Sequence, residues 1–100
     1  MQFTKRLREP IMRGEVTVSV RIWQRPQVKA RGRYRLGPGF ITVTSIRQIG
    51  LEDVTPELAR QSGFAGLVEL LKVAKHGSGR NVYLVRFEYS AGAPGSLEQP

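Results

Sequence analysis

Three stretches of the chain alternate between apolar and polar residues with a period of two, which is typical of β-strands that bury one face. They cover residues 16–23, 40–49 and 82–89, and a shorter stretch of the same kind covers residues 32–36. Between the second and third long stretches the period changes to that of a helix. A chain of 100 residues in this order predicts one small α+β domain in which strands outweigh helices.

The predicted strands assign side chains to faces. On the first long strand, the side chains expected to face the core are Val16, Val18, Val20 and Ile22. Its other face carries Thr17, Ser19, Arg21 and Trp23, a set that suits a polar groove. The second long strand is expected to place on one side Ile41, Val43 and Ile49. The third is expected to place on one side Tyr83, Val85, Phe87 and Tyr89, with Leu84 on the other.

Local signals predict three short helices. Thr55 as N-cap and Pro56 at the first helical position begin a helix that should end at Ser62, before Gly63. A second helix is expected over residues 66–75, and another over residues 4–13 if Pro10 lies in its first turn. A partly closed β-barrel of about five strands with two to three flanking short helices would cover these strands and remove exposed edges.

Positive charge is concentrated in the first half of the chain. Residues 1–50 hold eleven Lys and Arg against two Glu, a net of +9, whereas residues 51–100 carry a net of −1. No carboxylate occurs between Val16 and Leu51, and Arg outnumbers Lys twelve to four, which suits bidentate contact with phosphate. We therefore predict a nucleic-acid partner. The alternatives are an acidic protein, a membrane surface, or a basic surface with no specific anion.

The predicted nucleic-acid contacts combine cations with aromatic rings, as single-stranded nucleic acid requires. They are Thr17, Ser19, Arg21, Trp23, Arg25, Lys29, Arg31, Arg33, Tyr34, Arg35 and Arg80. Arg21 is the leading candidate for a phosphate or a base edge, and its alternative is an ion pair with Glu15 or Glu88. For Trp23 and Tyr34 the alternative is packing inside the barrel.

A set of segments in a fixed order carries a family resemblance. They are Ile11-Met12-Arg13-Gly14, Thr17-Val18-Ser19-Val20-Arg21, Gly32-Arg33-Tyr34, the strand at residues 41–49, Gly63-Phe64, Leu67-Val68-Glu69-Leu70-Leu71 and Val82-Tyr83-Leu84-Val85-Arg86-Phe87. Together they resemble the ASCH domain family, whose fold is similar to the PUA RNA-binding domain. The resemblance implies a PUA-like domain over residues 1–89, a cleft lined by Gly14, Thr17 and Arg21, and RNA as its ligand. A role in translation regulation or RNA processing would follow.

The resemblance also implies an alternative function, because some bacterial members are enzymes. The relatives that hydrolyse acetylcytidine use a lysine, a threonine and a glutamate, which fall here at Val16, at Ser19 and near Gly63. Valine cannot act as a nucleophile and glycine cannot shuttle a proton, so two of the three groups are missing. An enzyme acting on RNA or modified nucleosides, such as a weak ribonuclease, would depend on Ser19 or His76 as the catalytic candidates.

Composition also limits which cofactors, partners and cellular locations we expect. With one histidine and no cysteine we expect no metal and no cofactor. The absence of cysteine fits a reducing compartment, so we expect a cytoplasmic protein. No apolar run is long enough to span a bilayer, and no amphipathic helix with a basic face is visible, so we expect no membrane partner. Residues 90–100 lack a core pattern and predict a flexible tail. The sequence carries no signal for an oligomeric state.

Overall fold

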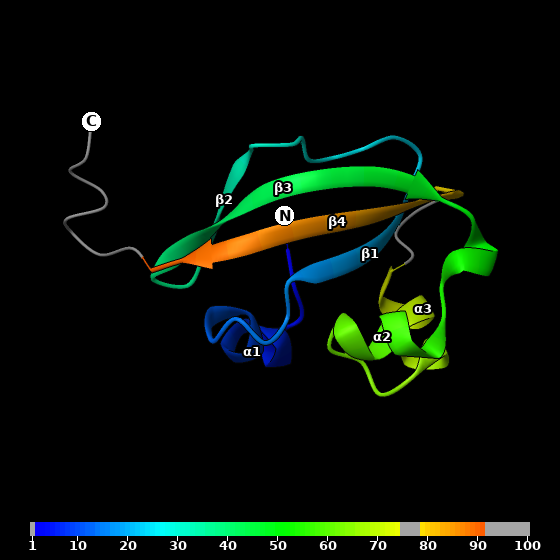
Figure 1. The fold of residues 1–100 in the computed structure, drawn as a ribbon, viewed down its shortest axis with the longest axis horizontal. Helices are drawn as coiled ribbons and strands as arrows, with labels where there is room; N and C mark the ends of the chain where they lie inside the picture. Colours follow the sequence, from blue (N-terminus) through cyan, green and yellow to red (C-terminus); the bar gives the residue numbers. More distant parts are fainter. Residues whose placement is uncertain (1, 75–78, 92–100) are drawn as a thin grey trace.

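The computed structural model describes residues 2–74 and 79–91. Its strands are β1 (Val18–Trp23), β2 (Arg33–Leu36), β3 (Gly39–Ile49) and β4 (Asn81–Ser90). They form one antiparallel sheet in the order β1-β4-β3-β2, which curls into a half-barrel (Figure 1). The α+β class and the partly closed sheet are therefore confirmed, although the described residues form four strands where about five were expected.

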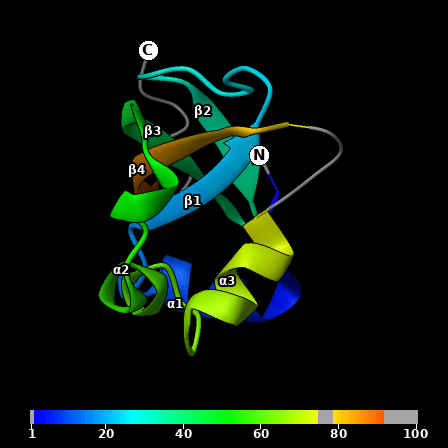
Figure 2. The same cartoon turned by 90° about the vertical axis from the view of Figure 1, so that its right-hand side faces the viewer.

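Three short helices lie together on one side of the sheet (Figures 1 and 2). They are α1 (Arg8–Met12), α2 (Pro56–Gln61) and α3 (Leu67–Ala74), and single 3₁₀ turns occur at Lys5–Leu7 and Leu51–Asp53. Pro10 occupies the first turn of α1, where its missing N–H breaks no helical hydrogen bond. No helix in the described part of the chain is long and apolar enough to cross a membrane.

The ends of α2 follow the local signals. The Thr55 side chain accepts a hydrogen bond from the Leu58 N–H at 3.1 Å, which caps the helix start. At the other end Gly63 adopts a φ of 95°, and the Phe64 N–H donates to the Ala59 carbonyl at 2.9 Å. A left-handed glycine with this bond closes a helix C-terminus, so both predicted ends are confirmed.

The sheet has one face that is buried along most of its length. On β4 this face carries Tyr83, Val85, Phe87 and Tyr89, as predicted. On β3, Ile41 and Val43 share the face, but Ile49 does not, because the register with β4 shifts between Val43 and Ser45. A β-bulge inserts one residue and reverses the alternation beyond it. Ile46 therefore takes the buried face, and the prediction for Ile49 is wrong.

The β1 strand is buried on both faces, which its sequence pattern did not indicate. Val18 and Val20 are buried as expected, but Ser19, Arg21 and Trp23 on the opposite face are buried as well. The side chains of this face are therefore covered, where the sequence pattern suggested that they lie open to solvent. The cover comes from the N-terminal segment and from the connection between β1 and β2, because Phe3 packs on Phe87 with ring centroids 5.4 Å apart and Val28 is buried.

Candidate anion-binding site

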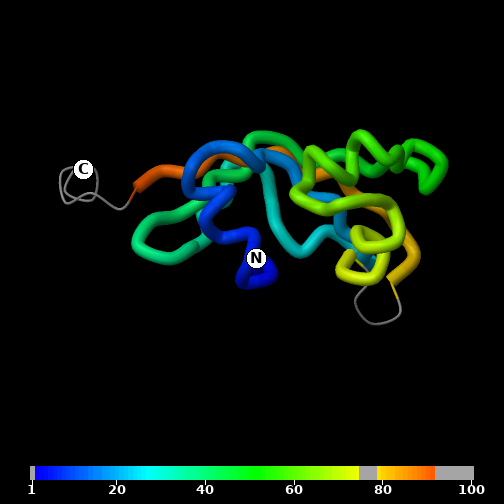
Figure 3. The backbone as a smooth tube through the Cα atoms, turned by 90° about the horizontal axis from the view of Figure 1, so that it is seen from below, coloured from blue at the N-terminus to red at the C-terminus, as the bar shows by residue number. Residues whose placement is uncertain are grey.

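A pocket of about 580 Å³ lies along β1, which is an edge strand of the sheet. Four parts of the chain line it, namely the N-terminal segment, β1, the connection to β2 and the end of α3 with the preceding Phe64. Figure 3 shows three of them side by side, with the N-terminal segment on one side of the connection and the end of α3 on the other. Its described lining residues are Gln2, Phe3, Thr4, Leu7, Ser19, Val20, Arg21, Trp23, Gln27, Val28, Phe64, Val73 and Ala74.

Arg21 is the only permanently charged group among those lining residues. Its side chain is 9% exposed, and its Nε donates to the Ser19 Oγ at 2.8 Å. Its Nη2 donates to the Gln2 carbonyl at 2.5 Å, and its guanidinium carbon lies 4.9 Å from the centre of the Phe3 ring. Nη1 makes no hydrogen bond with a described residue. Its two N–H groups, out of the five that a guanidinium carries, therefore remain available to a ligand.

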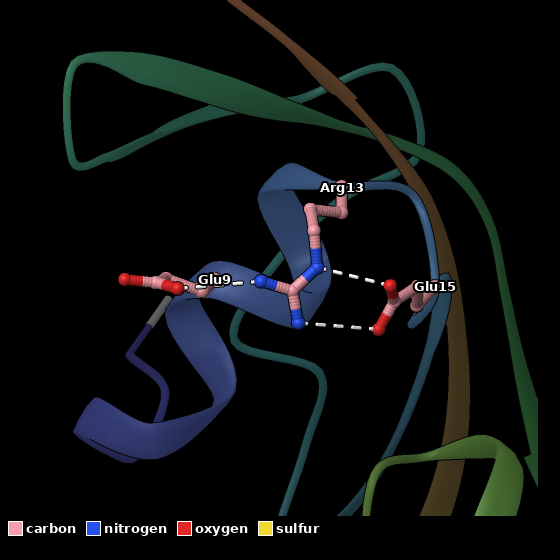
Figure 4. A network of polar contacts seen from close by, with 3 residues as sticks. All are labelled: Glu9, Arg13 and Glu15. Carbon is pink, nitrogen blue, oxygen red and sulfur yellow. Dashed lines mark hydrogen bonds and ion pairs between the residues drawn. The ribbon is translucent and has the colours of Figure 1, made fainter.

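Arg21 also has no carboxylate partner within the described chain. Neither expected ion pair forms, since Glu15 binds Arg13 and Glu88 lies on the opposite face of the sheet. Arg13 shows the contrast, because it sits between Glu9 at 3.3 Å and Glu15 at 2.9 Å (Figure 4). The hydrogen bond from Arg13, reinforced by its charge, lowers the pKa of Glu15. Arg21 therefore carries a buried charge that no described residue neutralises.

Burial alone lowers the pKa of Arg21 to about 10, because removing water disfavours the charged form. The group is still protonated at neutral pH. Relative to an exposed arginine, this shift corresponds to roughly 3 kcal/mol of destabilisation of the folded state at pH 7. The penalty is complete below pH 10 and decreases as the pH rises further, because the folded state then releases its proton before the unfolded chain does.

We expect Arg21→Met to raise the free energy of unfolding at pH 7 by about 1 kcal/mol, since two lost hydrogen bonds worth ~1 kcal/mol each offset part of the burial penalty. Methionine also retains a favourable contact with the Phe3 ring. Urea unfolding of the two proteins, compared at equal m values, measures the change. A variant that is less stable than the wild type by 1 kcal/mol or more would contradict a net cost for this charge.

Exposed cations occur beside each lining segment. The following lie within two positions of a lining residue: Lys5, Arg6, Arg8, Arg25, Lys29 and Lys72. Arg6 pairs with Glu69 at 2.9 Å, and the other five make no ion pair with described residues. Arg80 is exposed next to Asn81, whose side chain donates to the Gln24 carbonyl at 2.8 Å at the end of β1. We call these exposed cations, which adjoin the lining residues in the sequence, the rim cations.

The structure separates some predicted contacts from this pocket. Arg33 and Arg35 are exposed on the face of the sheet opposite to Arg21, as the strand register shows. Thr17 is exposed just before β1, and Arg31 is exposed just before β2 with a φ of 70°. Neither is a lining residue.

The two aromatic candidates differ in placement. Trp23 lines the pocket but is 4% exposed, and its ring lies 6.0 Å from that of Tyr83. Tyr34 packs against the core, and its hydroxyl accepts a hydrogen bond from the Lys29 N–H at 3.1 Å. Little of the Trp23 ring is therefore open to a ligand without rearrangement.

The catalytic candidates are only partly described. Ser19 lines the pocket, where its hydroxyl accepts the Arg21 hydrogen bond. The described lining residues include no His, Asp, Glu or Lys that could take a proton from it. His76 lies outside the described residues, as do residues 92–100 of the tail expected over residues 90–100. The tail boundary is wrong at Ser90, which is the last residue of β4 and pairs with Phe40. Across residues 2–74 and 79–91, no three His, Cys, Asp or Glu side chains are grouped to hold a metal ion.

Sequence reasoning missed more than half of the lining. Gln2 and Phe3 come from a segment with no regular pattern, Thr4 begins the helix expected over residues 4–13, and Val73 and Ala74 fall within the helix expected over residues 66–75. Thr4 places a buried hydroxyl at the pocket that has no hydrogen-bond partner among residues 2–74 and 79–91. A buried hydroxyl without a partner is costly, and a ligand could supply one.

No family model, curated protein or solved structure matches the chain. The resemblance to the ASCH family therefore stays a prediction. What the site does must be inferred from Arg21 and its surroundings.

Proposed function

We propose that the protein binds single-stranded RNA and that Arg21 holds one phosphate of the strand in the pocket. The observation that supports this most is the charge of Arg21, which is buried beside a cavity and has no acidic partner in the described chain. A phosphodiester carries one negative charge and acceptor oxygens, so it matches one guanidinium in charge and in hydrogen bonding.

The geometry of the pocket defines how the phosphate would bind. Its oxygens would accept from the free Nη1 of Arg21, and the unpartnered Thr4 hydroxyl could donate at the same site. The Gln2 carbonyl now accepts from Nη2, so a ligand that uses both Nη atoms must displace it. The apolar walls formed by Phe3, Val28 and Phe64 suit the sugar and base that are attached to the phosphate.

The exposed rim cations would hold the neighbouring phosphates of the strand. Each phosphate neutralised on a single strand steepens the salt dependence of log K by roughly 0.7, so four or five engaged cations predict a slope of about −3. Fluorescence anisotropy with a labelled oligouridylate, repeated over a series of KCl concentrations, measures this slope. A flat response to salt would contradict binding through the rim cations.

The same titrations distinguish the alternatives. Parallel measurements with DNA of the same length and with polyphosphate separate RNA recognition from attraction to any polyanion. Incubation with end-labelled RNA tests for an enzyme: cleavage that persists through repurification and is lost in Ser19→Ala or His76→Ala would favour a ribonuclease. Binding without cleavage supports the proposal.

A further inference from the structure

The face of the sheet opposite to Arg21 carries a second group of arginines. They are Arg33 and Arg35 on β2, Arg47 on β3 and Arg86 on β4, and all four are exposed. The register places them on one face, because Arg33 pairs with Thr42, Thr42 with Glu88, and Ser45 with Arg86. Residues directly opposite each other in an antiparallel pair point to the same side of the sheet.

These four residues, which we call the outer arginine strip, run across three neighbouring strands. Arg35 and Arg33 are two positions apart on β2. Farther in the same direction along the strands lie Arg86 on β4 and then Arg47 on β3. With a rise of ~3.4 Å per residue, the strip extends over about 20 Å. A strip of this length can contact several phosphates of one strand, whereas a single small anion would engage only part of it.

The strip has no internal counter-charge of matching size. None of its four arginines makes an ion pair with a described residue, and Glu88 is the one carboxylate among them on this face. Four guanidinium groups around one carboxylate leave a net positive surface, which repels itself unless a polyanion is bound. The strip lies on the face of the sheet opposite to Arg21, the one charged residue that lines the pocket.

Arg33 is already ordered for such a contact. Its guanidinium carbon lies 4.1 Å from the centre of the half-buried Phe40 ring. A guanidinium stacked on a ring keeps its N–H groups free at the edge and loses less conformational entropy when it binds an anion. Lysine, a flexible point charge, would lack this property, and the strip contains none.

We infer that the outer arginine strip is a second binding surface, separate from the pocket, for the phosphate backbone of a nucleic-acid strand. The inference shares its ligand class with the proposed function but does not depend on the pocket. A protein with both surfaces contacts a long strand at two places, or two strands at once, whereas a short oligonucleotide can occupy only one of them.

The test compares Arg47→Ala/Arg86→Ala with a control that removes the same charge elsewhere, Arg13→Ala/Arg60→Ala. For a labelled oligouridylate of about 20 nucleotides we expect the strip variant to bind on the order of tenfold more weakly than the control at low salt, with a salt slope flatter by about 1.4. Binding of a 5′-phosphorylated uridine trinucleotide in the pocket should be unchanged in both. Far-UV circular dichroism and thermal unfolding verify that both variants fold.

Glu88→Gln provides a test of opposite sign, because removing the carboxylate within the strip should strengthen binding of the long oligonucleotide by about twofold or more. Equal affinities of the strip variant and the control for the long oligonucleotide would overturn the inference. So would binding to phosphatidylglycerol vesicles that the strip variant loses while its RNA binding stays intact. Failure of the proposed function has a different readout, namely trinucleotide binding that does not depend on Arg21.

Discussion

Arg21→Gln is expected to weaken binding of a 5′-phosphorylated uridine trinucleotide by at least thirtyfold, since loss of one partner of a buried charged contact costs ~2–5 kcal/mol. Glutamine keeps a polar side chain that can still bond Ser19, but it removes the charge and the Nη1 donors. Isothermal titration calorimetry or anisotropy competition measures the affinity. The loss should appear mainly in the dissociation rate, because the rim cations that attract the strand remain.

Arg13→Gln is the matched control for this substitution. It removes the same group and the same charge, but Arg13 is exposed and its hydrogen bonds go to Glu9 and Glu15. We expect it to change trinucleotide affinity by no more than about twofold. If Arg21→Gln and Arg13→Gln had the same effect, Arg21 would act only as part of the net charge, and the pocket would not be the binding site.

Arg21→Lys refines the same experiment. Lysine keeps the positive charge but cannot donate to Ser19 and to a phosphate in the fixed fork geometry of arginine. An affinity between those of the wild type and Arg21→Gln is therefore expected. Full affinity in the lysine variant would show that charge alone is recognised.

Phe87→Ala is expected to lower the free energy of unfolding by about 3–5 kcal/mol, the range for removing a fully buried aromatic side chain from a core. Phe87 is 2% exposed in the middle of the core and packs against the Phe3 ring. A small domain is stable by only ~5–15 kcal/mol, so this one change removes a large part of its stability. Urea or thermal unfolding monitored by circular dichroism measures it.

Phe40→Ala is the matched control, since it removes the same ring from the neighbouring strand of the sheet. Phe40 is half-buried under Arg33 on the outer face, so its loss should cost no more than about 1 kcal/mol. Equal costs for the two variants would contradict the placement of the core. Because Phe3 rests on Phe87 and covers Arg21, Phe87→Ala should also change trinucleotide binding in the fraction that remains folded.

The position of the N-terminal segment links stability to ligand entry. Gln2 bonds the same guanidinium that a phosphate would bind, and Phe3 stacks on it. These contacts relieve part of the cost of burying Arg21 when no ligand is present. A neutral carbonyl is a weaker acceptor for a guanidinium than a phosphate oxygen, so the ligand can replace it without leaving the charge unpaired.

Short-range signals determined the elements of this protein. Thr55 and Pro56 began α2, Gly63 ended it, and alternation along β4 assigned Tyr83, Val85, Phe87 and Tyr89 to one face. These signals are reliable because a cap, a left-handed glycine and a two-residue period depend on bonds within a few residues. The concentration of unpaired arginine in the first half of the chain was likewise visible without coordinates.

The tertiary structure alone decided where those arginines lie. Sequence reasoning grouped Arg21, Arg33 and Arg35 as contacts of one nucleic-acid partner, but the register of the four strands puts Arg21 on one face of the sheet and the other two on the opposite face. Register depends on pairing between distant strands, and one bulged residue between Val43 and Ser45 reverses every later side chain of β3. The cover over Arg21 comes from Gln2 and Phe3, which no local pattern marks, because burial is a property of the whole packed chain.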